Sequence, residues 1–116
     1  MSAQVRVQRE SESSPALPGP ALRSALSREQ AEDTASLLRV VSDPTRLQLL
    51  SLIHHRSDGR AKVGELTAAL GLRQPTVSHH LKVMTDAGIV ARDPVGREVW
   101  YTIVPTRLAA IADLLR

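Results

Sequence analysis

The fold is decided by the stretch Gln74-Pro75-Thr76-Val77-Ser78-His79-His80-Leu81-Lys82. Its polar residues recur four apart, from Gln74 through Ser78 to Lys82, and so share one face of a helix. Apolar residues at i, i+4 and i+7 share the opposite face. These are Val77, Leu81 and Met84. The pattern predicts a helix that packs with one face and presents the other to a polar partner.

A second amphipathic helix is expected just upstream, where Val63, Leu66 and Leu70 follow helical spacing. The intervening Gly71-Leu72-Arg73 is short enough for the tight turn of a helix-turn-helix. The second helix of such a motif normally enters the major groove of DNA.

Composition favours one mostly helical domain. Trp100 and Tyr101 are the only aromatic residues in the 116-residue chain, so aliphatic helix packing must supply most of the core. Residues 60 to 97 carry six Lys or Arg against three acids, which accounts for the whole net charge of +3. A basic surface around the helix-turn-helix is typical of proteins that contact phosphates, although scattered cations also occur on ordinary solvated faces.

Several functional classes are excluded or disfavoured. The chain has no cysteine, which excludes disulfides and thiolate metal sites. No apolar run approaches the roughly 20 residues that span a bilayer, and no signal peptide is recognisable, so a cytoplasmic location without membrane contact is expected. Catalysis is disfavoured because the adjacent Ser78 and His79 diverge on a helix and no phosphate-binding glycine loop occurs.

Two segments precede the helix-turn-helix. Residues 1–26 are rich in Ser, Pro and Arg and predict a disordered tail, so the folded domain is expected over residues 27–116. Ser27 and Gln30 match a capping box that starts the first helix. Asp43-Pro44 starts the next, with an N-cap acid followed by proline. The core face of this second helix is expected to contain Leu47, Leu50 and Ile53, widened by Leu49 and Leu52.

After the central helix, Asp86-Ala87-Gly88 supplies a glycine stop and the period changes from 3.6 to 2. Ile89 to Arg92 predict one strand, and the alternation of Val99, Tyr101 and Ile103 predicts another. Pro94-Val95-Gly96 is expected at the tip of this hairpin. A two-stranded hairpin carrying Arg92 and Arg97 beside a helix-turn-helix is a wing.

The last helix, beginning at Pro105, has an apolar stripe that is wide for a chain end. The stripe consists of Leu108, Ile111 and Leu115. Together with Leu38 on the first helix it predicts a homodimer interface formed by the first and last helices. Two-fold symmetry would place the two recognition helices about 34 to 36 Å apart on a pseudo-palindromic operator.

Four motifs in this order closely resemble the bacterial arsenic-repressor (ArsR/SmtB) family of winged helix-turn-helix regulators. They are Ser42-Asp43-Pro44-Thr45-Arg46-Leu47, the stretch from Gln74 to Lys82, Ala87-Gly88 and Gly96-Arg97. The resemblance covers about residues 27 to 116. It implies a homodimeric transcriptional repressor that leaves DNA when an effector binds.

Carried over by this resemblance, the residues that face the base edges are Gln74, Thr76, Ser78 and His79. The residues expected on phosphates or in the minor groove are Lys82, Arg92 and Arg97. Arg73 stands where relatives often have a capping Ser, which weakens the cap but adds a charge close to the DNA backbone. His80 falls on the inward side and is interpreted as a packed, hydrogen-bonded histidine.

The effector is not identified by the resemblance. Arsenite and cadmium sensors of the family have Cys-x-Cys where this chain has Lys62-Val63-Gly64, and zinc, cobalt and nickel sensors have Asp-x-His where it has Pro105-Thr106-Arg107. A non-standard site of nitrogen and oxygen ligands for nickel, zinc or cobalt stays open. The histidine pairs His54-His55 and His79-His80 cannot chelate alone, so carboxylates would be needed: Glu29, Glu32, Asp33 or Asp113. The other alternative is a winged-helix module whose DNA binding is controlled by a regulatory protein partner.

Overall fold

The computed structural model describes residues 26–115, which contain five helices and three strands. The predicted tail therefore lies outside the described residues except for Leu26. The side chains of Ile111 and Leu115, both predicted in the dimer interface, are also outside the description.

The first two described helices begin at the caps that the sequence predicts. Helix α2, Arg28–Val41, starts with a capping box in which the Gln30 amide donates to Ser27 Oγ and the Ser27 amide donates to Gln30 Oε1, both at 3.0 Å. Helix α3, Pro44–His54, starts at Asp43, whose carboxylate accepts from the Arg46 amide at 3.1 Å. Both caps satisfy amides that have no partner inside the helix.

The predicted core face of α3 is wrong at Leu47, which is 51% exposed. The fully buried residues are Leu49 and Ile53, four apart, with Leu50 and Leu52 packed against them at the edge of the core. Five aliphatic residues cover much of this helix, so spacing alone left its rotation undetermined.

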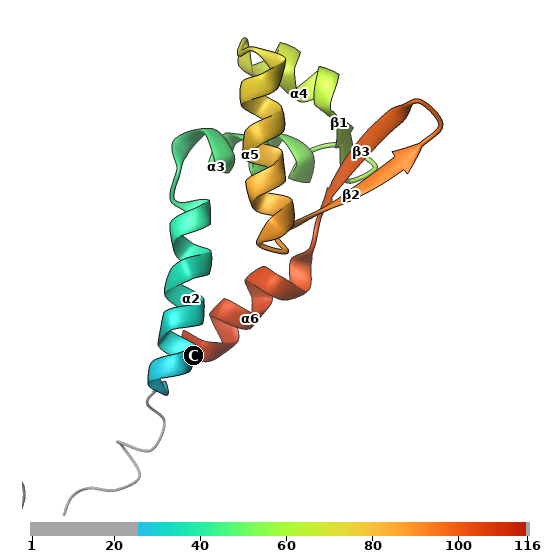
Figure 1. Ribbon diagram of the computed structural model, residues 1–116. Coiled ribbons are helices and arrows are strands. Elements are labelled where there is room, and N and C mark those ends of the chain that lie inside the picture. Colours follow the sequence, from blue (N-terminus) through green and yellow to red (C-terminus); the bar gives the residue numbers. More distant parts are fainter. Residues whose placement is uncertain (1–25, 116) are drawn as a thin grey trace, which may run out of the picture.

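Helix α4, Val63–Leu70, and helix α5, Gln74–Asp86, form the predicted helix-turn-helix. Gly71 ends α4 with φ +67°, a left-handed conformation that favours glycine. The inner face of α5 is fully buried against α3 and the sheet, as predicted. Figure 1 shows α5 standing between α3, α4 and the sheet.

The sheet has one strand more than the sequence predicts. Strand β1, Arg60–Lys62, pairs antiparallel with β3, Glu98–Ile103, which pairs on its other side with β2, Val90–Val95. The predicted tip is also misplaced, since Val95 pairs with Glu98 and the turn consists of Gly96 and Arg97. Pro94 lies in β2, where an edge strand tolerates its missing N–H.

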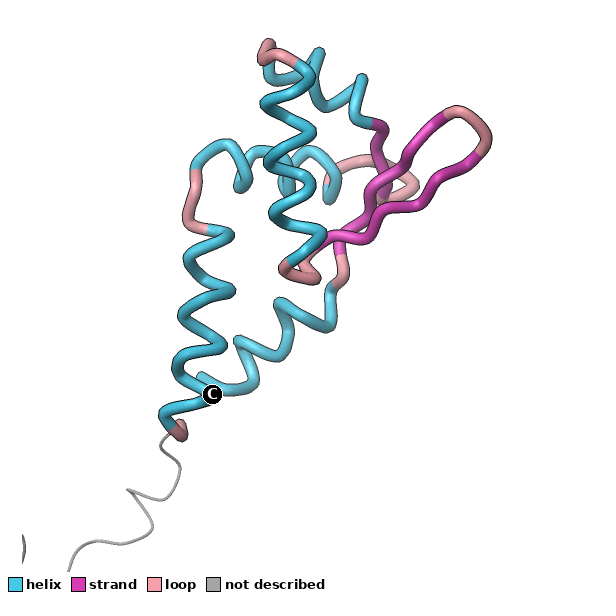
Figure 2. Tube along the Cα trace, viewed as in Figure 1, coloured by secondary structure: helices cyan, strands magenta, loops and turns pink. Residues whose placement is uncertain are grey.

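Helix α6, Pro105–Leu115, follows β3. In Figure 1, α2 and α6 lie at the end of the molecule away from α4 and the tip of the hairpin. Figure 2 shows that a short loop joins the magenta sheet to α6. Among the described residues no helix is long and apolar enough to cross a membrane.

Candidate nucleic-acid interface

The outer face of α5 presents the polar residues that the sequence predicts to face DNA. Ser78 is half-buried, and the others in this helix are exposed: Gln74, Thr76, His79 and Lys82. The opposite side is fixed by Val77, Leu81 and Met84, each 0% exposed. Burying all three apolar side chains limits the rotation of α5, and hence which side chains can face outward.

The start of α5 carries a positive charge but no side-chain cap. Arg73 is the N-cap residue, and its side chain makes no capping hydrogen bond. The guanidinium therefore lies at the exposed N-terminus of α5, where the positive end of the helix dipole also favours anions. This agrees with the weak cap expected from the sequence.

Lys82, near the end of the same face, is paired with a carboxylate. Its Nζ lies 3.0 Å from Asp86 Oδ2, one helical turn away, and both side chains are largely exposed. Exposed pairs of this kind are weak and screened by salt. A phosphate can therefore compete with Asp86 for the ammonium at little cost.

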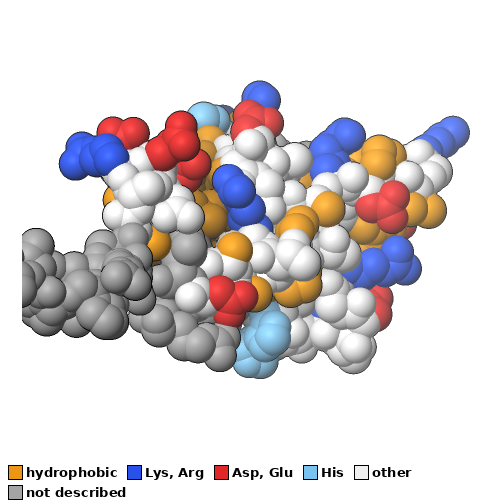
Figure 3. Space-filling model, turned by 90° about the horizontal axis from the view of Figure 1, so that it is seen from below, with side chains coloured by type: hydrophobic (Ala, Val, Ile, Leu, Met, Phe, Trp, Pro, Cys, Tyr) orange, Lys and Arg blue, Asp and Glu red, His pale blue; other side chains and the backbone are white. Residues whose placement is uncertain are grey.

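The wing supplies Arg92 in β2 and Arg97 in the turn, both exposed. Gly96, with φ +62°, makes the two-residue turn that places Arg97 at the tip. In Figure 3, Lys and Arg side chains project from the wing end of the molecule. Together, α5 and the wing offer two separate projections with basic and polar side chains.

A groove joins these two projections. It has a volume of about 640 Å³ and is lined by the start of α4, the start of α5 and the wing. Gln74 and Arg97 both contribute to its walls, although 23 positions separate them in the chain. A helix in a major groove and a wing on the adjacent minor groove have a phosphate backbone between them, and a groove at this place suits that geometry.

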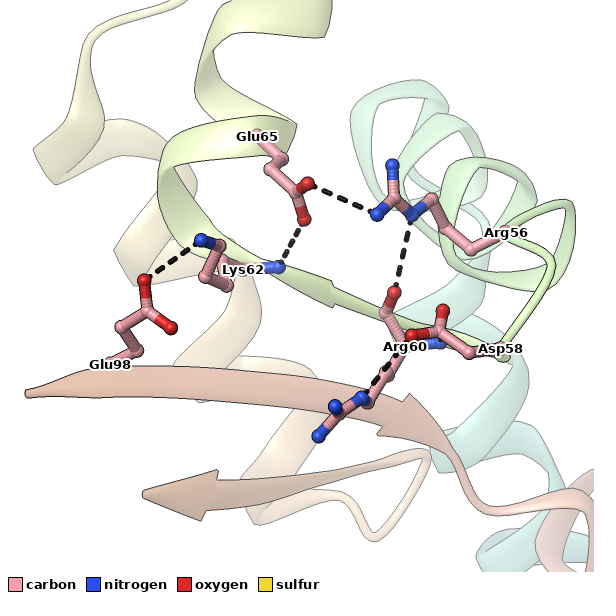
Figure 4. A network of polar contacts seen from close by, with 6 residues as sticks. All are labelled: Arg56, Asp58, Arg60, Lys62, Glu65 and Glu98. Carbon is pink, nitrogen blue, oxygen red and sulfur yellow. Dashed lines mark hydrogen bonds and ion pairs between the residues drawn. The ribbon is translucent and has the colours of Figure 1, made fainter. Parts of the chain in front are cut away.

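A polar network that sequence reasoning missed joins the wing to β1 and α4 (Figure 4). Lys62 Nζ lies 2.8 Å from Glu98 Oε2, and Arg56 Nη2 lies 3.1 Å from Glu65 Oε2. The Lys62 amide also donates to Glu65 Oε1 at 3.0 Å, so β1, the start of α4 and β3 are tied together. The hydrogen bond to Glu98 raises the pKa of Lys62 above its usual value.

The other half of this network surrounds Trp100. The Arg60 guanidinium carbon lies 4.0 Å from the centre of the Trp100 ring, and Lys62 Nζ lies 5.2 Å from it. Arg60 also pairs with Asp58 at 3.3 Å. Burial opposes ionisation of Asp58, but the hydrogen bonds from Arg60 outweigh it and hold its pKa below the usual value. The sequence indicated this network only by the alternation of two basic residues around a small one, in Arg60-Ala61-Lys62.

Two further arginines contact α5 from behind. Arg46 of α3 donates from Nε to Nδ1 of His80 at 3.1 Å, so His80 is a packed, hydrogen-bonded residue as predicted. Arg107 of α6 donates from Nε to the carbonyl of Ala87 at 3.2 Å, at the C-terminal end of α5. A cation at this position satisfies a free carbonyl and complements the helix dipole.

No metal centre is formed within the described part of one chain. It contains no group of three or more His, Cys, Asp or Glu residues able to hold an ion. The rings of His54 and His55 are perpendicular, with centres 5.2 Å apart, and His55 Nδ1 contacts the Ser51 carbonyl at 2.8 Å. Glu29, Glu32 and Asp33 are exposed on α2, and Asp113 is exposed on α6.

Comparison with known proteins gives a consistent set of matches. Residues 43–92 match the family model described as bacterial regulatory protein, arsR family. The chain is 33% identical over 88 residues to the HTH-type transcriptional regulator NmtR of Mycobacterium tuberculosis, covering 76% of this chain and 71% of that protein. It is 33% identical over 103 residues to a probable mercury resistance operon repressor of Streptomyces lividans, covering 89% of this chain and 80% of the relative.

A solved structure shares the arrangement of helices and hairpin. HlyU from Vibrio cholerae superposes with a TM-score of 0.65 at 29% identity, covering 77% of this chain and 94% of that chain. The winged helix-turn-helix predicted from the sequence is therefore confirmed, with the additional strand β1.

Proposed function

Because the chain belongs to the bacterial arsR family of DNA-binding transcriptional regulators, we propose that residues 27–116 act as a homodimeric repressor on a pseudo-palindromic operator. The protein is a regulator and not an enzyme, as the sequence predicts. We place its action in the cytoplasm, where chromosomal DNA is available to it.

In this proposal α5 lies in the major groove and reads base edges through Gln74, Thr76, Ser78 and His79. Arg73, Lys82, Arg92 and Arg97 contact phosphates or the minor groove. The observation that carries the proposal is the division of α5 into a fully buried apolar face and an exposed polar face that continues into the wing groove.

The test is selection of bound duplexes from a random-sequence DNA pool. We expect an inverted repeat whose half-site centres are about 10 base pairs, or a multiple of one helical turn, apart. Recovery of unrelated sequences, with affinity that depends only on salt, would contradict sequence-specific recognition. Recovery of a single unrepeated half-site would contradict the dimer while leaving the recognition helix intact.

We propose that α2 and α6 form the dimer interface, through Leu38, Leu108, Ile111 and Leu115. Leu38 is 44% exposed within one protomer, and members of the family generally act as homodimers. Sedimentation of Leu38→Glu should show dissociation at concentrations where the wild type is dimeric. The matched control is Leu47→Glu, since Leu47 on α3 is 51% exposed but lies outside the proposed interface. Equal dissociation of the Leu38→Glu and Leu47→Glu dimers would refute this interface.

Control by a metal ion is a second candidate, because one relative is a probable mercury resistance operon repressor. The described residues of one protomer do not fit a metal, and the absence of cysteine disfavours the thiolate-seeking ions. Nickel, zinc or cobalt would need ligands from both protomers, and the exposed Glu29, Glu32 and Asp33 on the proposed dimer helix α2 are the available donors. Calorimetric titration with each ion tests this, and the absence of heat with all three would exclude it.

A further inference from the structure

The half-buried imidazole of His80 lies on the inward side of α5, beside the buried apolar residues of that helix. Its Nδ1 receives a hydrogen bond of 3.1 Å from Arg46 Nε. The same guanidinium donates from Nη1 to the carbonyl of Val40 at 3.2 Å, in the last turn of α2. Arg46 itself lies in the first turn of α3, so a single side chain connects three helices.

The contact requires a particular charge state of His80. A guanidinium has only donors and stays protonated, so it can donate only to a ring nitrogen without a proton. His80 is therefore neutral in this arrangement, with its proton on Nε2. Protonation of Nδ1 would remove the acceptor and place a second positive charge 3.1 Å from Arg46.

The titratable groups nearest in sequence to this pair are Asp43 and His79. On α3 the carboxylate of Asp43 is engaged by the Arg46 amide at 3.1 Å. On α5 the nearest titratable ring is His79, whose centre is 6.1 Å away. The buried residues on the other elements packed against α5 do not ionise. They are Thr34 and Leu37 of α2, Leu66 of α4 and Val90 of β2.

The orientation of His80 is tied to the outer face of α5. Adjacent residues on a helix point about 100° apart, so holding His80 against Arg46 keeps His79 turned outward. Val77 and Leu81 limit the same rotation by packing, but apolar contacts are less directional than a hydrogen bond. Because Arg46 also holds the end of α2, the rotation of α5 is set relative to that helix.

We propose that Arg46 is a positioning residue for DNA recognition, which acts through neutral His80 to hold the base-reading face of α5 in register with α2. This inference rests on the proposed role of α5 in reading bases. It predicts that sequence selectivity, more than general DNA affinity, depends on Arg46 and on the charge of His80.

The readout is the selectivity ratio, defined as the affinity for the duplex selected by the wild-type protein divided by the affinity for a scrambled duplex of equal length. It is measured at constant salt at about pH 5.5, 6.5 and 7.5. We expect the wild-type ratio to fall by roughly fivefold or more from the highest to the lowest pH, as the bond to Arg46 is lost.

Two matched variants distinguish the contribution of His80 from that of His79. In His80→Asn the amide oxygen occupies nearly the place of Nδ1 and accepts from Arg46 without titrating, so the ratio should stay near the wild-type value at every pH. His79→Asn has the same helix cost and should keep the wild-type pH dependence, though with a lower ratio. If His80→Asn keeps that dependence, or His79→Asn abolishes it, the inference is wrong.

Arg46→Met removes the donors and keeps much of the stem, and should give a low ratio that does not change with pH. Arg28→Met is the charge-matched control, since the Arg28 side chain is 88% exposed and its ion pair within the described residues is with Glu32, one turn away. Equal ratios for these two variants would overturn the proposal. Melting temperatures identify any unfolded variant, and if Arg46→Met is unfolded the two histidine variants decide. A wild type that selects no duplex would instead refute the proposed function.

Discussion

Leu47 and Leu49 offer a matched pair of substitutions on α3, because they are the same residue two positions apart and so about 200° apart around the helix. Leu49 is 0% exposed in the core, whereas Leu47 is 51% exposed. Leu49→Ala should lose the transfer free energy of its buried methyl groups and leave a cavity, together about 2–5 kcal/mol. Leu47→Ala should lose less than about 1 kcal/mol, since much of its surface already contacts water.

The assay is urea and thermal unfolding, followed by helical circular dichroism at one fixed protein concentration, because dimer stability depends on concentration. For a domain of this size the Leu49→Ala change corresponds to a lower melting temperature by roughly 10 °C or more. Leu47→Ala should melt within a few degrees of the wild type. Equal losses, or a larger loss for Leu47→Ala, would refute the rotation of α3 and with it the packing behind α5.

Three further outcomes are expected. Arg97→Ala should weaken binding to all duplexes alike. The slope of the logarithm of the binding constant against the logarithm of the salt concentration should become smaller by about 1, as for the loss of one phosphate contact. A loss of affinity confined to the selected duplex would contradict this. Arg107→Met should destabilise the protein by roughly 0.5–1.5 kcal/mol in urea unfolding, because the Ala87 carbonyl loses its donor; an unchanged midpoint would show that water replaces the guanidinium. Deletion of residues 1–22 should leave the melting temperature unchanged, and a large drop would show that this segment packs on the domain.

The features predicted correctly from the sequence depend on neighbours within one turn of helix. The capping box at Ser27, the Asp43 cap and the glycine stop at Gly88 each need only local spacing and backbone preference. The two faces of α5 were also predictable, because Val77, Leu81 and Met84 share one side of the helix. Local and tertiary preferences agree in these places.

The features that were missed depend on tertiary contacts. Strand β1 has three residues and no alternation long enough to recognise, and it exists because β3 offers an edge for pairing. Pro94 is a strong turn signal, yet it lies in β2 because that strand is at the edge of the sheet. The rotation of α3 about its axis could not be predicted, because leucines occur around much of that helix.

The residues of the candidate site were also predictable where they share one helix, and were missed where they are distant in the sequence. Spacing on one helix was enough to predict the outward set on α5 and the inward position of His80. The proximity of Gln74 and Arg97 along one groove, the Lys62–Glu98 pair and the Arg46–His80 contact join residues more than 20 positions apart. Only the folded arrangement of α3, α5 and the wing reveals them.

The central claim is that the outer face of α5 reads base edges, and the most direct test is binding of Ser78→Ala and His79→Ala to the selected and scrambled duplexes. Each base contact contributes about 1–3 kcal/mol, so affinity for the selected duplex should fall by roughly 5- to 150-fold per substitution. Affinity for the scrambled duplex should change little. The control is His54→Ala, an exposed histidine at the end of α3, which should leave both affinities unchanged. Equal losses of Ser78→Ala and His79→Ala on both duplexes would contradict the claim that α5 reads the DNA sequence.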